Sequence, residues 1–270
     1  MRLIYYSLAR AEHSDYDSQW IQSIRSLRRH NSTTSVSLFL FNGASEDLLH
    51  EAARCGVTIR ALGDYREYLM PGMIAMTMVF GIGATLSAVS ADAARGVIDR
   101  FRSLPMSAPA VIAGRAAADM LNSAAALAVL TGCGFAAGWH PHRGAARAIA
   151  ALGLLLLLRF AFLWVGVYLG LRFYPNPEAV TAVRTLEFPL GFLGNPFVAV
   201  STMPAWLGAI ALWNPLSSTV TAARQLFGDP IGANSSWITS HAIIMAVAWP
   251  LLLTAVFFPL SLRRYQRLSR

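Results

Sequence analysis

Long apolar stretches with few or no charged residues are the feature that most constrains the fold of this chain. A helix that crosses a bilayer needs about 20 such residues. Four stretches meet that requirement: 69–91, 116–139, 148–171 and 237–262. A fifth, 188–223, has no charged residue but is interrupted by Pro196, Pro204 and Pro215, so we expect one span and a re-entrant hairpin there. With 55% hydrophobic and 13% charged residues, the sequence predicts a mainly α, polytopic membrane helix bundle of about five spans.

The first 64 residues have a different pattern. Leu3–Leu8, Ser35–Phe41 and Val57–Arg60 have the composition of β-strands, and helix-like segments lie between them. This order predicts a small β-α-β-α-β segment, about half of a doubly wound sheet. We therefore expect two domains: a partial α/β segment at 1–64 and a membrane domain at 65–270.

Arginine placement predicts which loops face the cytoplasm. The sequence has 22 basic residues, and all of them are Arg. Short cytoplasmic loops of membrane proteins are enriched in positive residues, and the strongest asymmetry places the C-terminus inside. The Arg residues on that side are Arg95, Arg100, Arg102, Arg172, Arg184, Arg263, Arg264, Arg267 and Arg270. Only Arg143, Arg147 and Arg224 then lie in outside loops. We expect a multi-pass protein of the cell (inner) membrane with a cytoplasmic C-terminus.

A short basic amphipathic segment, 95–106, lies between the first two apolar stretches. Its apolar residues follow one stripe at helical spacing, which leaves the charged residues for an aqueous partner, and Pro105 ends the helix. The candidate contacts with a soluble partner are Arg95, Asp99, Arg100, Phe101, Arg102, Leu104 and Pro105. The alternative interpretation is an interfacial helix whose Arg residues anchor it to lipid.

Three motifs in order resemble the permease subunits of type-2 ABC exporters, with the daunorubicin-resistance permeases as the nearest branch. They are Tyr68–Met73 entering a span, Arg95–Ser107, and Trp213–Leu216 followed by Ala223–Gly228. The resemblance covers residues 65–270. It implies six helices, a cytoplasmic N-terminus, two paired permeases (a homodimer or a heterodimer), and docking of the loop after the second helix on a separate ATPase.

The expected function is therefore that of a transport subunit without its own ATPase site. A phosphate-binding P-loop needs a Lys, and this sequence contains none. We expect the partner subunit to use ATP and Mg²⁺, and this chain to bind no cofactor or metal and to have no catalytic residue. The expected partners are an ABC ATPase, a second permease and the lipid bilayer, not nucleic acid. A drug, a lipid or a glycan precursor would each suit as an exported hydrophobic or amphipathic substrate.

Charged residues inside or between the apolar stretches are further candidates. Arg159 lies in the middle of a predicted span, where it could line a translocation path or pair with an acid. Asp119 lies one helical turn after Arg115, which favours a pair within that helix. Glu178 and Glu187 fall in the predicted middle cytoplasmic loop and are expected to be a second contact with the ATPase.

The N-terminal segment departs from the family pattern, because the family's first membrane helix would precede Tyr68 and residues 1–67 contain no apolar stretch of that length. Residues 1–64 instead weakly resemble the start of a nucleotide-sugar glycosyltransferase domain. Two hypotheses follow: a gene fusion or mis-joined reading frame near residues 63–68, and a functional soluble segment. The alternative functions are thus a membrane-anchored glycosyltransferase fragment and a nonfunctional chimera.

Overall fold

The computed structural model describes residues 3–8, 22, 36–41, 50, 53–55, 58–61, 65–95, 108–197, 200, 203–229 and 236–268. The chain divides into two compact units, Met1–Leu69 and Met70–Arg270.

The first unit contains a three-stranded parallel sheet. Its strands are β1 (Leu3–Leu8), β2 (Val36–Phe41) and β3 (Thr58–Ala61), in the order β1-β2-β3. Tyr5 of β1 pairs with Leu38 of β2, which in turn pairs with Ile59 of β3. Parallel neighbouring strands must be joined by crossover connections, and the predicted β-α-β-α-β order contains such a connection between each pair of strands. The three strands lie within one residue of their predicted bounds, whereas most of the residues between them lie outside the described part of the chain.

In the part of the chain that the structure describes, four helices are long and apolar enough to cross a membrane. They are α3 (Tyr65–Ala94), α5 (Ala108–Ala136), α6 (Ala145–Phe173) and α11 (Ala242–Leu268). Each overlaps a predicted span; the largest difference is at the start of α5, which begins at Ala108 where the prediction began at 116. These helices confirm a mainly α, polytopic membrane protein.

The predicted fourth span, within 188–223, is not a single helix. This part of the chain contains the end of α7 (Pro177–Phe192), then α8 (Ala205–Trp213) and α9 (Pro215–Phe227). The interruption between α8 and α9 falls at Asn214-Pro215, as expected. Asn214 has an extended backbone, and its side-chain oxygen accepts from the backbone N–H of Leu216 at 2.9 Å, so it ends one helix and caps the next. A short helix, α10 (Trp237–Ser240), leads into α11.

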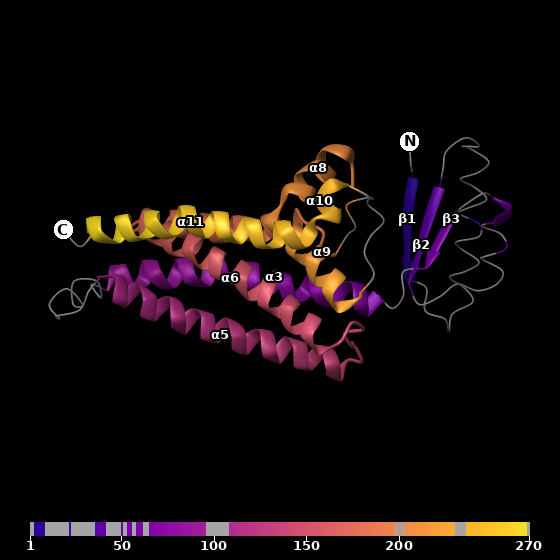
Figure 1. Cartoon of the computed structure of the whole chain (residues 1–270). Coiled ribbons are helices and arrows are strands. Elements are labelled where there is room, and N and C mark those ends of the chain that lie inside the picture. The colour runs from indigo at the N-terminus through magenta and orange to yellow at the C-terminus, as the bar shows by residue number, and fades with distance from the viewer. Residues whose placement is uncertain are drawn as a thin grey trace. The chain divides into compact units, whose positions relative to one another are not determined.

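Contacts between the long helices fix their directions, and Figure 1 shows the arrangement. A Cβ added to Gly166 of α6 would lie 3.0 Å from the carbonyl oxygen of Ile82, and one added to Gly170 would lie 2.9 Å from that of Leu86. Ile82 and Leu86 belong to α3, so α3 and α6 run in the same direction. The small glycine residues let the two backbones approach closely. The side chain of Ser261 on α11 bonds to the carbonyl of Trp164 at 3.2 Å, and that of Arg264 to the carbonyl of Leu171 at 3.4 Å.

The C-terminal ends of α3, α6 and α11 consequently lie at one end of the bundle. Helix α5 runs in the opposite direction, so its first turns lie beside the last turns of α3 (Figure 1). A core of fully buried apolar side chains from α3, α6 and α9, including Ile74, Leu155 and Val220, lies towards the other end. This apolar core thus lies away from the bundle end at which α3 finishes and α5 begins.

Candidate functional site

The most prominent polar feature of the bundle is the side chain of Arg159 on α6, which is 2% exposed. Its Nε donates to the hydroxyl of Ser123 at 2.9 Å, and its Nη2 donates to the hydroxyl of Thr85 at 2.8 Å. The same Nη2 forms an ion pair with Oδ2 of Asp119 at 2.5 Å. Because charges are costly within a membrane unless they are paired, this cluster explains how a mid-span Arg is accommodated.

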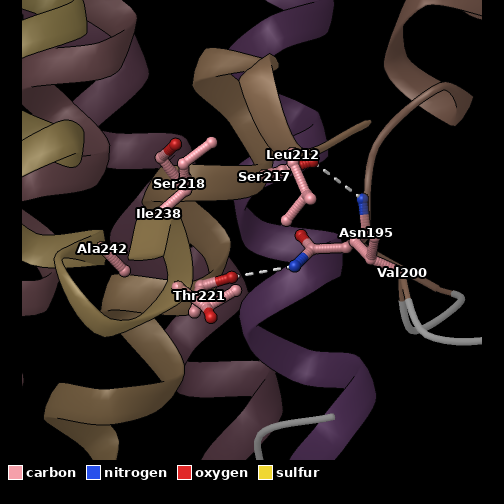
Figure 2. Close-up of a pocket in the computed structure, with 9 residues that line it drawn as sticks. Asn195, Val200, Leu212, Ser217, Ser218, Thr221, Ile238 and Ala242 are labelled. Carbon is pink, nitrogen blue, oxygen red and sulfur yellow. Dashed lines mark hydrogen bonds between the residues drawn. The ribbon is translucent and has the colours of Figure 1, made fainter. Parts of the chain in front are cut away.

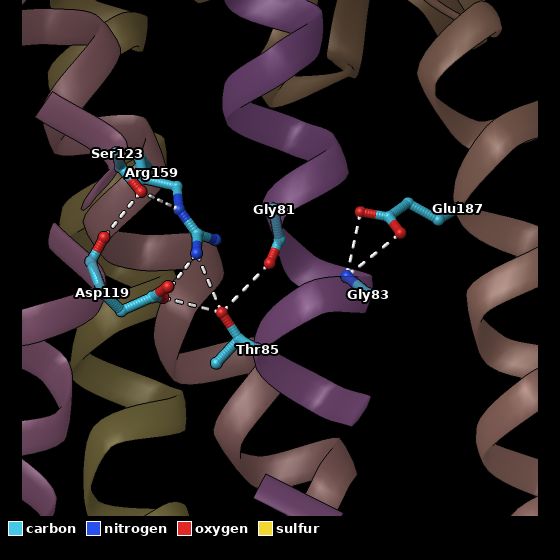
Figure 3. A network of polar contacts seen from close by, with 7 residues as sticks. All are labelled: Gly81, Gly83, Thr85, Asp119, Ser123, Arg159 and Glu187. Atoms are coloured by element: carbon cyan, nitrogen blue, oxygen red, sulfur yellow. Dashed lines mark hydrogen bonds and ion pairs between the residues drawn. The ribbon is translucent and has the colours of Figure 1, made fainter. Parts of the chain in front are cut away.

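The partners of Arg159 are also bonded to one another (Figure 3). The hydroxyl of Thr85 lies 2.7 Å from Asp119 Oδ2 and 3.0 Å from the carbonyl oxygen of Gly81, and Ser123 donates to the carbonyl oxygen of Asp119 at 2.8 Å. Three helices, α3, α5 and α6, therefore contribute to one network. We call Thr85, Asp119, Ser123 and Arg159 the Arg159 cluster.

A glycine on α3 leaves room for the guanidinium group. A Cβ added to Gly81 would lie 2.5 Å from Arg159 Cζ and 2.6 Å from Nη1, closer than any side chain tolerates. Nη1 is buried and has no hydrogen-bond partner among the described residues. The guanidinium is thus pressed against the α3 backbone, and any larger residue at position 81 would displace it.

Glu187 of α7 approaches the other side of α3 (Figure 3). Its carboxylate accepts from the backbone N–H of Gly83, with both oxygens 3.0 Å from the nitrogen. A Cβ at position 83 would lie 2.2 Å from the carboxylate, so glycine is required for this contact as well. The pair Gly81 and Gly83 therefore lets two charged side chains reach one helix.

These positions correct parts of the sequence interpretation. The predicted middle cytoplasmic loop is short, because α7 begins at Pro177, with Asn176 as its N-cap. Glu178 is exposed in the first turn of α7, and Glu187 lies within the helix and faces α3. The role of both residues as a second contact with the ATPase stays a prediction. Asp119 pairs with Arg159 and not with Arg115, which forms an ion pair with Asp92 of α3.

The candidate docking residues lie largely outside the described part of the chain. Arg95 is described, directly after α3, and is exposed. Asp99, Arg100, Phe101, Arg102, Leu104 and Pro105 belong to the undescribed segment 96–107. Their role as contacts with an ATPase stays a prediction, as does a place for Arg159 on a translocation path.

A second buried polar group lies where α9 meets the turn at 194–197. Arg224 is 2% exposed and donates to the carbonyl oxygens of Asn195 and Pro196 at 3.1 and 2.8 Å. The side-chain amide of Asn195 donates to the hydroxyl of Thr221 at 2.8 Å, and its backbone N–H donates to Ser217 Oγ at 3.1 Å. Figure 2 shows these two bonds beside a small pocket. The pocket is lined by Asn195, Val200, Leu212, Ser217, Ser218, Thr221, Ile238, Thr239 and Ala242.

Sequence reasoning missed several of these polar residues. Thr85, Ser123 and Asn195 are uncharged polar residues within mainly apolar stretches, and Ser, Thr and Asn are also common at helix interfaces without any function. The available signal was their spacing: Ser123 lies four residues after Asp119, on the same helical face.

Comparisons with known proteins identify the family. The ABC-2 type transporter profile matches residues 32–227, a range that begins within the predicted α/β segment. The daunorubicin resistance ABC transporter permease protein DrrB1 of Streptomyces coeruleorubidus is 31% identical over 229 residues, which cover 84% of this chain and 74% of the relative. The putative transport permease ycf38 of Cyanophora paradoxa is 27% identical over 95 residues, which cover 35% of this chain and 31% of the relative. Together with the four apolar helices, these matches show that the chain belongs to the ABC-2 type transporter family, as a multi-pass membrane permease.

Proposed function

We propose that the chain is the permease subunit of an ATP-driven exporter that moves a hydrophobic or amphipathic compound out of the cell. The observation that carries this proposal is the 31% identity to a permease named for daunorubicin resistance, over 84% of the chain. A separate ABC ATPase supplies the energy, and a second permease copy completes the pathway. Daunorubicin is the natural first probe of substrate class, because the relative is named for resistance to it.

The geometry of the helices supports a cytoplasmic position for segment 95–105. The last turns of α6 and α11 lie at the same end of the bundle as the end of α3, and they carry the exposed residues Arg172, Arg263 and Arg267. Positive residues concentrate at the cytoplasmic ends of spans. The C-terminus and the docking segment are thus proposed to share the cytoplasmic side with the ATPase.

Co-purification tests the partnership directly. The permease is expressed with the ABC ATPase encoded beside it, and the complex is isolated through a tag on the permease. ATP-dependent uptake of daunorubicin into inside-out vesicles then tests the substrate class. Failure of the ATPase to co-purify would contradict the proposed partnership, and hydrolysis without uptake would exclude daunorubicin as the substrate.

A charge reversal tests the docking segment. Arg102→Glu should remove the ATPase from the purified complex, because it places a negative charge where a positive contact is proposed. Arg267→Glu is the matched control, since it makes the same substitution at an exposed residue near the predicted cytoplasmic end. If both variants retain the ATPase equally well, the docking role of Arg102 is wrong.

A further inference from the structure

The two helices on either side of segment 96–107 are tied together close to that segment. Asp92 lies in the last turn of α3, Arg115 lies in the second turn of α5, and their side chains form an ion pair. Both side chains are about one-third exposed, at 33% for Asp92 and 37% for Arg115. The pair is therefore within reach of water at the end of the bundle where the segment is attached.

The Arg159 cluster continues this contact into the bundle. Thr85 lies seven residues before Asp92, which is about two helical turns along α3. Asp119 lies four residues after Arg115, one turn along the antiparallel α5, and it contacts both Thr85 and Arg159. The contacts thus form a ladder with an outer rung, Asp92–Arg115, and an inner rung, Thr85–Asp119–Arg159.

The two rungs differ in how firmly they hold the helices. In the inner rung, Arg159 is 2% and Thr85 3% exposed, and separating it would leave buried polar groups without partners, which is costly. The outer rung is about one-third exposed, so it holds α3 and α5 less firmly than the inner rung does, because water can replace part of the lost contact. Helices α3, α5 and α6 are consequently locked at the inner rung, whereas the outer rung sets how α3 and α5 are positioned at the ends that hold the segment.

We propose that the Asp92–Arg115 pair is a positioning element that transmits displacement of segment 96–107 to the Arg159 cluster, so that α5 moves with α3 when the ATPase acts. This inference rests on the proposed docking of the ATPase at 95–105. The pair contacts neither substrate nor nucleotide in this assignment. Its role is to keep two helix ends together while force is applied between them.

The test uses charge reversal with rescue and a readout that needs no substrate. The variants are Asp92→Arg, Arg115→Asp and the double exchange, each in a Cys55→Ser background. Cys133 is exposed near the far end of α5, so its reaction rate with N-ethylmaleimide reports on the surroundings of that end. The rate is measured in the complex with the ATPase, with and without ATP and vanadate. Arg147→Asp, an exposed residue near the start of α6, is the control.

In the complex that keeps Asp92 and Arg115, we expect nucleotide trapping to change the reaction rate of Cys133 with N-ethylmaleimide by about fivefold. This is near the lower end of the couplings seen between distant sites. Each single reversal should abolish that change while the ATPase stays bound, and the double exchange should restore it. The control should behave like the unmodified protein. A merely structural contact would instead alter ATPase binding or the melting temperature, without a selective loss of the nucleotide response.

Several results would overturn the inference. One is a nucleotide response that survives either single reversal, and another is a loss that the double exchange does not repair. A third is an unmodified complex in which the ATPase binds and hydrolyses ATP while the Cys133 rate stays constant. If the ATPase does not bind the unmodified permease at all, the proposed function fails first, and co-purification reveals that failure separately.

Discussion

Removing the carboxylate of Asp119 should destabilise the bundle more than any other single change in the Arg159 cluster. Arg159 is 2% exposed, and in Asp119→Ala its guanidinium would keep only the Ser123 and Thr85 hydroxyls as hydrogen-bond partners. Breaking a buried ion pair by deleting one member costs about 3–5 kcal/mol. For a unit of 150–250 residues, each kcal/mol lowers the melting temperature by about 2–4 °C, so we expect a decrease of about 6–20 °C.

Removing the guanidinium of Arg159 should destabilise the bundle less than removing the carboxylate of Asp119. In Arg159→Met, the Asp119 side chain keeps the Thr85 hydroxyl as a donor, and it is 21% exposed and can reach water. The cost should be nearer to that of one unsatisfied polar group, about 1–3 kcal/mol. The double variant removes both charges, and replacing a buried pair by apolar residues is often neutral. It should therefore melt at a higher temperature than Asp119→Ala alone.

Thermal unfolding of the purified permease, followed by intrinsic Trp fluorescence in one detergent, gives these values. Arg147→Met is the matched control, because Arg147 lies on the same helix as Arg159 but is exposed; it should melt within about 1–2 °C of the unmodified protein, as surface changes usually do. The reasoning is refuted if Asp119→Ala also melts in that range. It is equally refuted if the two deletions add in the double variant, because additivity would mean that the charges do not interact.

Three further changes test other contacts in the bundle. Gly170→Leu should lower the melting temperature by about 2–12 °C, since overpacking costs about 1–3 kcal/mol and a Cβ there meets the Leu86 carbonyl at 2.9 Å. Position 153 on the same helix has open space around it, so Gly153→Leu should not lower the melting temperature. Equal melting temperatures of the two variants would contradict the α3–α6 contact. Arg224→Met should lower the free energy of unfolding, measured with a denaturant, by about 3 kcal/mol, because it removes two charged hydrogen bonds to buried carbonyls. A loss below about 1 kcal/mol would show that other contacts replace these bonds. Asn176→Ala should cost about 1 kcal/mol through loss of the α7 N-cap, whereas Asn176→Asp should retain stability; matched melting curves of the two variants would argue against capping.

Much of the architecture could be predicted because membrane spans are defined by length and apolarity alone. The four long helices follow directly from these two properties. The predicted fourth span does not match one helix of the structure. The prolines in 188–223 indicate that no single helix fills this stretch, but they do not specify where each shorter helix begins. Asn214-Pro215 was the exception, since an Asn that can cap and a Pro that starts a helix together specify the boundary.

The relation of residues 1–64 to the rest of the chain could not be predicted from pattern. The strand composition led to three strands at the expected positions, and the same pattern suggested a join near residues 63–68. The family match runs from residue 32 through that point, and α3 begins at Tyr65 and continues without interruption to Ala94. Because α3 begins inside the range 63–68, its continuity does not test a join there, and the fusion hypothesis stays a prediction.

The pairing of charges is where local sequence rules failed, and the energies explain why. The spacing of Arg115 and Asp119 favours a pair within α5, but such a pair contributes only about 0.3–0.5 kcal/mol at a surface. Leaving Arg159 buried without a counter-charge would cost several times more. Asp119 therefore forms its ion pair with Arg159, and Arg115 forms one with Asp92. Which acid lies within reach of Arg159 depends on the rotation of α5 about its axis, and helical spacing along one chain segment does not contain that information. The larger energy thus sets the register of three helices, and the smaller contact at their ends adapts to it.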